Sequence, residues 1–135
     1  MAWLLWPDTG TNTTGSLSGI GGNGEIDFPE RNLNSAYVSG FVHHQDATLN
    51  SDQDAFKVPI NGTAWQTAVI EWSPNLVVFK LNGVVIGSTT TRVPNTPMHW
   101  VLQTETALDG TIPADAARGN VQIDWVAAWA YAPPA

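Results

Sequence analysis

The sequence contains no cysteine, and this absence excludes two ways in which small domains are commonly stabilised. Neither a disulfide framework nor a thiolate metal site can form. A chain without thiols suits either side of a membrane, so the redox compartment cannot be read from cysteine usage.

Basic residues are also scarce. Five Lys and Arg residues stand against twelve Asp and Glu residues, which gives a formal net charge of −7, and the five cations are scattered along the chain. A protein that binds nucleic acid usually presents a clustered basic surface to the phosphates. We therefore expect no nucleic-acid partner.

Long apolar runs are absent as well. The apolar start at residues 1–6 ends at Pro7, which makes it too short for the core of a signal peptide, and no basic residue precedes it. No later run approaches the roughly 18 residues that a membrane-spanning helix requires. We interpret the start as a strand and expect a soluble protein with no membrane partner.

The sequence has no helical apolar stripe of useful length but is rich in Trp, Gly and Pro, with seven, twelve and nine residues respectively. This composition predicts an all-β fold in one domain, residues 1–135. Short apolar or alternating runs separated by turn-forming residues predict strands at 2–6, 24–28, 36–44, 64–72, 76–81, 84–88, 98–104 and 120–131.

Two of these predictions depend on clear local patterns. Asn82-Gly83 separates two apolar runs, and this pair tolerates the positive φ angles of a tight hairpin turn. The final run alternates, so its apolar side chains should share one face and line a core. Those side chains belong to Val121, Ile123, Trp125, Ala127, Trp129 and Tyr131.

The segment Gly24-Glu-Ile-Asp-Phe-Pro-Glu30 gathers three carboxylates in six residues. Strand alternation places Glu25 and Asp27 on the face opposite to the apolar side chains of the same segment. Glu30 has the wrong parity for that face, unless a β-bulge near Phe28-Pro29 inserts one extra residue. We expect such a bulge, and with it all three carboxylates on one face.

Paired carboxyl groups are the usual machinery of retaining glycoside hydrolysis, in which one acts as nucleophile and the other as acid and then base. In this hypothesis Glu25 is the nucleophile, Glu30 is the acid/base, and Asp27 between them orients Glu25. The carboxylates alone suit a solvated strand face or a calcium site equally well, so the residue pattern leaves these alternatives open.

The motif Glu25-Ile-Asp-Phe-Pro-Glu30 resembles the bulged E-x-D-x-x-E motif of family 16 glycoside hydrolases, as found in laminarinase-like members. Further segments resemble the family in the expected order. They are Trp3-Leu-Leu-Trp-Pro7, Ala64-Trp-Gln-Thr-Ala-Val-Ile-Glu-Trp72, Leu81-Asn-Gly83, Pro97-Met-His-Trp-Val-Leu-Gln103 and Val121-Gln-Ile-Asp-Trp125.

The resemblance implies a jelly-roll β-sandwich of the concanavalin A-like lectin/glucanase type. It also implies an extracellular, endo-acting, retaining hydrolase of a β-linked polysaccharide, with a β-1,3-glucan or a mixed-linkage β-1,3-1,4-glucan as substrate and no required cofactor. The matching begins about a third of the way through the family pattern, and such domains run to roughly 200–250 residues. We therefore expect the N-terminal strands to be missing, and the chain to form oligomers or aggregates.

Other residues match family positions near the substrate. His43 is our choice for the cleft, because neighbouring His44 should point to the other side of its strand. Gln103 matches a polar amide position, and His99 shares its face by alternation. Trp6 is expected to supply a sugar platform.

Asp124 matches a position that often helps bind a structural calcium ion, so it is our candidate metal ligand. The alternative to an enzyme is a non-catalytic carbohydrate-binding jelly roll or a structural protein, such as a virion decoration. The complete acidic triad argues for the enzyme, since a lectin does not need three carboxylates on one strand.

Overall fold

The computed structural model describes residues 1–8, 22–49, 51–106 and 111–133. Among these residues, all regular structure is β and no helix occurs. The strands are β1 (Ala2–Pro7), β2 (Glu25–Glu30), β3 (Tyr37–His43), β4 (Gln53–Pro59), β5 (Ala68–Ser73), β6 (Leu76–Leu81), β7 (Val84–Thr89) and β8 (Met98–Gln103). No described helix therefore has the length and apolarity needed to cross a bilayer.

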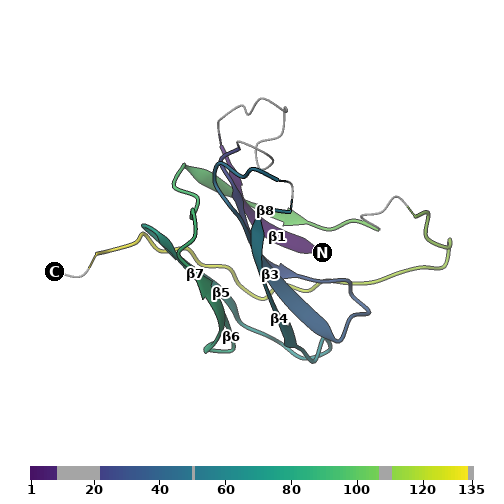
Figure 1. Ribbon diagram of the computed structural model, residues 1–135. Coiled ribbons are helices and arrows are strands. Elements are labelled where there is room, and N and C mark those ends of the chain that lie inside the picture. Colours follow the sequence, from purple (N-terminus) through teal and green to yellow (C-terminus); the bar gives the residue numbers. More distant parts are fainter. Residues whose placement is uncertain (9–21, 50, 107–110, 134–135) are drawn as a thin grey trace. The chain divides into compact units, whose positions relative to one another are not determined.

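The strands form two antiparallel sheets (Figure 1). The first has five strands in the order β4-β3-β2-β1-β8, and the second has three in the order β5-β6-β7. This arrangement confirms the all-β class and is consistent with a β-sandwich. The predicted hairpin is also confirmed, since Asn82 and Gly83 join β6 to β7 with φ angles of 51° and 81°.

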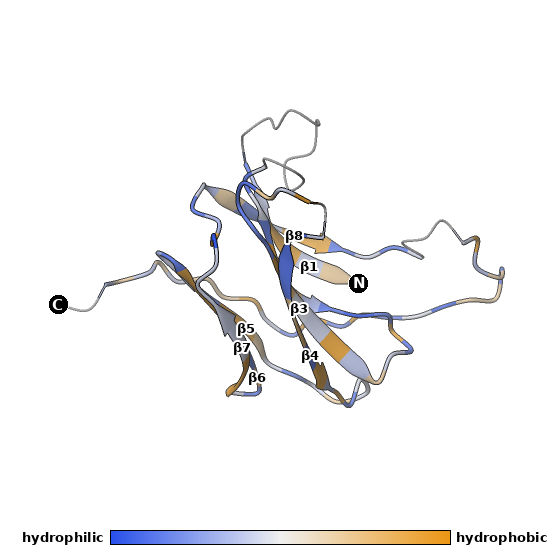
Figure 2. Cartoon of the chain, in the orientation of Figure 1, coloured by the Kyte–Doolittle hydropathy of each residue, from blue (hydrophilic) through white to orange (hydrophobic). Residues whose placement is uncertain are grey.

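The two sheets share one apolar core, formed where the inward side chains of β2 and β3 meet those of β6. In Figure 2 the strands carry short apolar stretches, coloured orange, between polar ones. Phe79 lies at the centre, with its ring centroid 5.1 Å from that of Phe28 and 5.9 Å from that of Phe56. The buried members of the core are Ile26, Phe28, Val38, Val42, Val77, Phe79, Leu81 and Val93.

Gly40 lets the sheets approach closely at this core. A Cβ atom on Gly40 would lie 2.8 Å from the ring of Phe79, which is too close for any side chain. The missing side chain on β3 therefore makes room for the large aromatic residue of β6. This packing fixes the inner face of β3, and so determines which of its residues point to the opposite face.

Strand β4 was not predicted, and β5 is shorter than predicted. The β4 segment begins beside a cluster of Asn, Ser and Asp residues and carries Asp54 and Lys57, so its apolar alternation is weak. Strand β5 begins at Ala68 instead of residue 64, because residues before it form a turn that leaves Trp65 66% exposed.

The predicted closing strand at 120–131 is wrong for the structure described. The chain divides into a unit Met1–Thr104, which contains all eight strands, and a unit Glu105–Ala135. Residues 120–131 have no strand pairing, and Trp125 and Trp129 are 60% and 80% exposed. Alternation produces a strand only where a neighbouring strand accepts and donates backbone hydrogen bonds, and none of the described strands includes residues 120–131.

Candidate active site

A β-bulge on β2 places the three acidic residues on one face of the five-stranded sheet. Asp27 lies opposite Phe41 on β3, and Glu30 lies opposite Ser39, so β2 advances three residues while β3 advances two. The same extra residue appears in the pairing of β2 with β1. The predicted bulge is therefore confirmed, and the peptide bond at its centre, Phe28-Pro29, is cis.

The bulge allows β2 to bury its apolar side chains while its glutamates stay outside the core. Ile26 and Phe28 are buried in the core at 0% and 2% exposure, whereas Glu25 and Glu30 are only partly buried. Without the extra residue, Glu30 would follow the parity of Phe28 and point into the core, where a carboxylate is costly. The insertion turns Glu30 to the outer face.

Strand pairing brings the other predicted residues to this same outer face. On β3, His43 lies directly opposite Glu25. On β1, Trp6 shares the face of Leu4, which is opposite Asp27, and Trp6 pairs with His99 of β8. Gln103 also belongs to this face, because it is opposite Ala2, which in turn is opposite Glu30. Directly opposed residues project to the same side of a sheet.

Asp27 is the most buried member of the acidic group, with 2% of its surface exposed. Its neighbours across the ladder are the apolar side chains of Leu4 and Phe41. Burial raises the pKa of Asp27 to about 7, a hydrogen bond with Glu25 acts to lower it, and the charge of Glu30 adds to the increase. At neutral pH this carboxyl group therefore still holds a proton much of the time.

A hydrogen bond between two carboxyl groups requires that one of them carry a proton. Burial favours the neutral form of Asp27 and is the larger effect, whereas the bond with Glu25 acts to lower the pKa of Asp27 and so favours its ionised form. The two carboxyl groups therefore share one proton.

His43 provides the second contact of Asp27. Its Nε2 atom lies 3.1 Å from Oδ2 of Asp27, and its side chain is 26% exposed. The ring of Phe41 lies beside that of His43, with centroids 6.4 Å apart. The imidazole therefore links the buried carboxyl group to the accessible surface of the sheet.

Glu30 has a raised pKa as well. Burial is the largest cause, the charge of His43 acts in the opposite direction, and the charge of Glu25 raises the pKa further. Glu30 therefore keeps its proton to a higher pH than an ordinary glutamate does.

Gly24 determines how β2 enters the sheet. It has a φ angle of 77°, and a Cβ atom built on it would lie 2.6 Å from the carbonyl oxygen of His43. A larger residue would therefore push the start of β2 away from β3. This glycine keeps Glu25 next to His43.

The other predicted residues occupy the outer strands of the sheet. His99 contacts Asp8 through Nδ1 and Oδ1 at 2.6 Å, with both side chains about half exposed. Trp6 is half-buried beside it, and Gln103 is half-buried at the far end of β8. The structure therefore brings His43 into contact with the acidic group, while Trp6, His99 and Gln103 lie one or two strands away on the same face.

Asp124 lies in the other unit of the chain and is exposed. It does not belong to any group of three potential ligands among the described residues. Calcium binding at Asp124 therefore remains a prediction.

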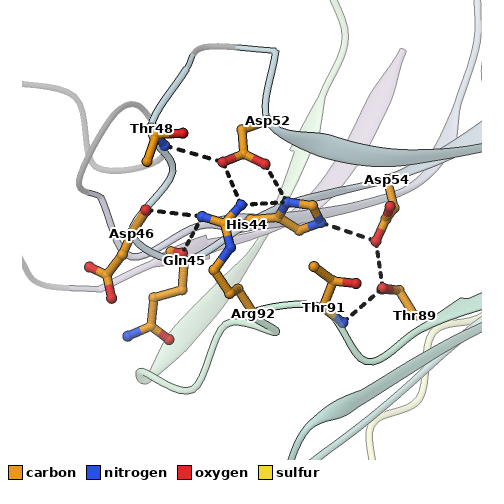
Figure 3. A network of polar contacts seen from close by, with 9 residues as sticks. All are labelled: His44, Gln45, Asp46, Thr48, Asp52, Asp54, Thr89, Thr91 and Arg92. Atoms are coloured by element: carbon orange, nitrogen blue, oxygen red, sulfur yellow. Dashed lines mark hydrogen bonds and ion pairs between the residues drawn. The ribbon is translucent and has the colours of Figure 1, made fainter.

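A polar network that the sequence did not indicate lies around His44 (Figure 3). Its Nδ1 atom is 2.7 Å from Oδ1 of Asp52, and its Nε2 atom is 3.0 Å from Oδ2 of Asp54. Thr89 of β7 donates a hydrogen bond to Asp54 of β4 at 2.5 Å, so the network connects the two sheets. Arg92 donates to Asp52. The only available sequence signal was the adjacent histidine pair.

The network shifts the titration of its acids. Hydrogen bonds from Arg92 and then His44 hold the pKa of Asp52 well below its usual range. For Asp54, burial raises the pKa, but hydrogen bonds from Thr89 and His44 outweigh this effect and lower it. Both acids are therefore ionised at neutral pH, as structural ion pairs require.

Comparison of the chain with protein-family models, with curated proteins and with solved structures finds no match. The functional assignment consequently depends on the geometry of the acidic face and on the motif resemblance.

Proposed function

We propose that the protein is an endo-acting, retaining glycoside hydrolase of the family 16 type, built on a concanavalin A-like jelly roll. The observation that carries the proposal is the bulge in β2, which turns Glu30 to the face of Glu25 and Asp27. A two-carboxylate mechanism requires both carboxyl groups on one face of the sheet, and in this sequence the extra residue brings Glu30 to that face.

In the first half-reaction, Glu25 attacks the anomeric carbon and Glu30 donates its proton to the leaving oxygen. The raised pKa of Glu30 supports this role, since a general acid must be protonated at the working pH. Formation of the glycosyl ester neutralises Glu25. Glu30 then loses one of the charges that raise its pKa, and it can accept a proton from the attacking water.

Asp27 acts on Glu25 rather than on the sugar. Its burial beneath the sheet face keeps it out of reach of substrate, and its hydrogen bond with Glu25 orients the nucleophile. A neutral Asp27 stabilises ionised Glu25 without adding another negative charge. His43 contacts Oδ2 of Asp27 and positions this pair.

The substrate in this proposal is a β-linked polysaccharide, with a β-1,3- or mixed-linkage β-1,3-1,4-glucan as first choice. Rows of opposed residues run across β3, β2, β1 and β8, so a polymer can lie perpendicular to the strands. Trp6 offers an apolar ring to a sugar face, while His99 and Gln103 offer polar groups. Such polymers are found outside cells, so we propose an extracellular site of action.

A reducing-sugar assay tests the proposal directly. The purified chain is incubated with laminarin, lichenan and agarose, and the Glu25→Gln variant is the control. Hydrolysis of one polymer by the wild type and not by the variant supports the assignment and identifies the substrate class. Equal rates for both proteins on every hydrolysed polymer would contradict it, as would no hydrolysis of these or other β-glycans.

The second candidate function is carbohydrate binding without catalysis. It is favoured by the exposure of Trp65, which is 66% accessible in the segment before β5 and offers its ring to a sugar face. Affinity electrophoresis in gels that contain each polymer distinguishes the two functions. Retardation without any release of reducing ends would favour the binding module.

A further inference from the structure

Three potential metal ligands meet on the outer face of the five-stranded sheet. Glu25, Asp27 and His43 each offer one ligand atom, and these three atoms lie within 4.8 Å of one another. Two residues come from β2 and one comes from β3, where His43 is directly opposite Glu25. The set is therefore held by the backbone pairing of two central strands rather than by a loop.

One carboxyl oxygen of Asp27 lacks a partner. Oδ2 of Asp27 contacts His43, but Oδ1 is buried and receives no hydrogen bond from any described donor. Asp27 as a whole is almost completely removed from solvent, since only 2% of its surface is exposed. A buried carboxylate oxygen without a donor is costly, and a cation is one of the groups that can satisfy it.

The donor types indicate which kind of cation suits the site. Calcium and magnesium prefer six or more oxygen ligands, or several retained waters, whereas this set contains an imidazole and only two carboxylates. Imidazole together with carboxylate suits zinc and its neighbours among the divalent transition metals. Three protein ligands with one open position are also the usual number for an accessible zinc ion.

The spacing is compatible with such an ion after a small adjustment. Zinc bonds of about 2.1 Å in tetrahedral geometry place neighbouring ligand atoms about 3.4 Å apart. The ligand atoms of the three residues are up to 4.8 Å apart, so binding requires a side-chain movement of roughly an ångström in Glu25 or His43. Both side chains are only partly buried, so rotation about their own bonds can supply this movement.

We propose that Glu25, Asp27 and His43 form a binding site for one divalent transition-metal ion, of which zinc is the representative, with a fourth position open to water. This site is separate from the calcium ligand predicted at Asp124 and does not depend on the hydrolase activity. It uses the outer face of the sheet, through which the ion can enter. Metal binding and glycan hydrolysis would then compete for Glu25.

Isothermal titration of the full, tag-free, chelator-treated chain with zinc chloride tests the proposal without any substrate. We expect one equivalent of zinc to bind. His43→Asn and Glu25→Gln should each weaken the affinity by on the order of 100-fold or more, because loss of even an outer partner of a metal ligand costs roughly 10- to 100-fold. Circular dichroism establishes that each variant is folded.

The matched control is His99→Asn. His99 also lies on the outer face, and it also contacts a carboxylate, that of Asp8, but it is not part of the three-residue set. Zinc affinity should be unchanged in this variant. The proposal is overturned if the wild type binds no zinc, or if His99→Asn weakens binding as much as His43→Asn does. A result with no hydrolysis of any glycan but His43-dependent zinc binding supports the metal site and contradicts only the hydrolase.

Discussion

The Nε2 atom of His43 lies 3.1 Å from Oδ2 of Asp27, and this contact joins a half-buried imidazole to a carboxyl group that is only 2% exposed. The other oxygen of Asp27 has no donor among the described residues. Asp27 is therefore held at one oxygen and left unsatisfied at the other. Such an arrangement costs stability, and it is expected where a side chain is kept for function.

The first prediction concerns the stability of Asp27→Asn in the presence of a chelator. The pKa of Asp27 is raised to about 7 from an ordinary 3.8, so the folded state holds a proton that the unfolded state releases. The acid therefore destabilises the fold progressively as the pH rises from about 4 to about 7, at about 1.4 kcal/mol per pKa unit. The melting temperature of Asp27→Asn, measured relative to that of the wild type, should therefore rise as the pH increases from about 4 to about 7.

Thermal melts at pH 4, 5.5 and 7 measure this difference. Turnover should fall in the same variant by roughly 10- to 1,000-fold with KM little changed, because an amide can donate a hydrogen bond to Glu25 but cannot exchange a proton with it as the carboxyl group does. A stability difference that is independent of pH would show that the pKa of Asp27 is not raised in the fold.

The second prediction separates the roles of the two glutamates. With azide and an activated β-glycoside, Glu30→Ala should yield the β-glycosyl azide, because Glu25 still forms the covalent intermediate. Glu25→Ala should yield the α-glycosyl azide by direct displacement. Each variant should lose several orders of magnitude in turnover on the polymer.

NMR spectroscopy of the products identifies the anomer, and Glu71→Ala is a suitable control, because Glu71 is an exposed acid on β5 that pairs with Lys80. The reverse pattern of anomers would exchange the two roles. Absence of any adduct from both variants would remove the covalent mechanism.

The third prediction concerns acid stability and the network around His44. The pKa of Asp52 is lowered in the fold, chiefly by Arg92, so its contribution to stability is present above the unfolded pKa of about 4. The contribution declines as the pH falls below that value toward the lowered pKa of the folded state. Asp52→Asn should therefore lower the melting temperature at pH 6, and the difference from the wild type should shrink toward pH 3. Calorimetry at the two pH values measures it.

Asp46→Asn is the matched control for this experiment. Asp46 lies beside the same arginine, but only its backbone carbonyl oxygen accepts a hydrogen bond from Arg92. Its substitution should change stability little at either pH. An Asp52→Asn effect that persists undiminished at pH 3 would mean that the network stabilises the protein through packing instead of charge.

The fourth prediction follows from the shared use of Glu25. Zinc at a concentration that fills the site should inhibit hydrolysis, and EDTA should restore it, because a coordinated carboxylate cannot attack the anomeric carbon. Calcium at the same concentration should inhibit much less. Initial rates at several zinc concentrations measure the effect, and full activity of the zinc-saturated protein would contradict the competition.

The sequence predicted the acidic face more completely than it predicted the sheets. Alternation and a single proline were enough to infer the bulge that aligns Glu30 with Glu25. The face to which each side chain of a strand projects follows from its position along that strand alone. The pairing of β4 was missed, because Asp54 appears in the sequence as an exposed acid. Its role became visible only once Thr89, 35 residues later, was found to donate a hydrogen bond to it.

The surroundings of Asp27 also depend on contacts between distant parts of the sequence. Nothing local to β2 shows that Leu4 and Phe41 flank this carboxyl group, since those contacts depend on the register of two other strands. The burial that raises its pKa was therefore beyond the reach of the sequence. Likewise, the alternation in residues 120–131 described a face but could not show which strand, if any, would pair with it.

The last prediction concerns those exposed apolar side chains. Ile112, Trp125 and Trp129 are 91%, 60% and 80% exposed, although residues of this kind are normally buried. Several of them in one segment favour association, because contact between molecules removes apolar surface from water at about 25 cal/mol per Å². Sedimentation velocity should therefore show oligomers that increase with protein concentration.

The double variant Trp125→Ser, Trp129→Ser should shift the distribution toward the monomer, whereas Trp65→Ser, which removes a comparably exposed ring from the other unit, should change it little. A wild-type protein that remains monomeric at every concentration would show that these side chains are covered within the chain in solution.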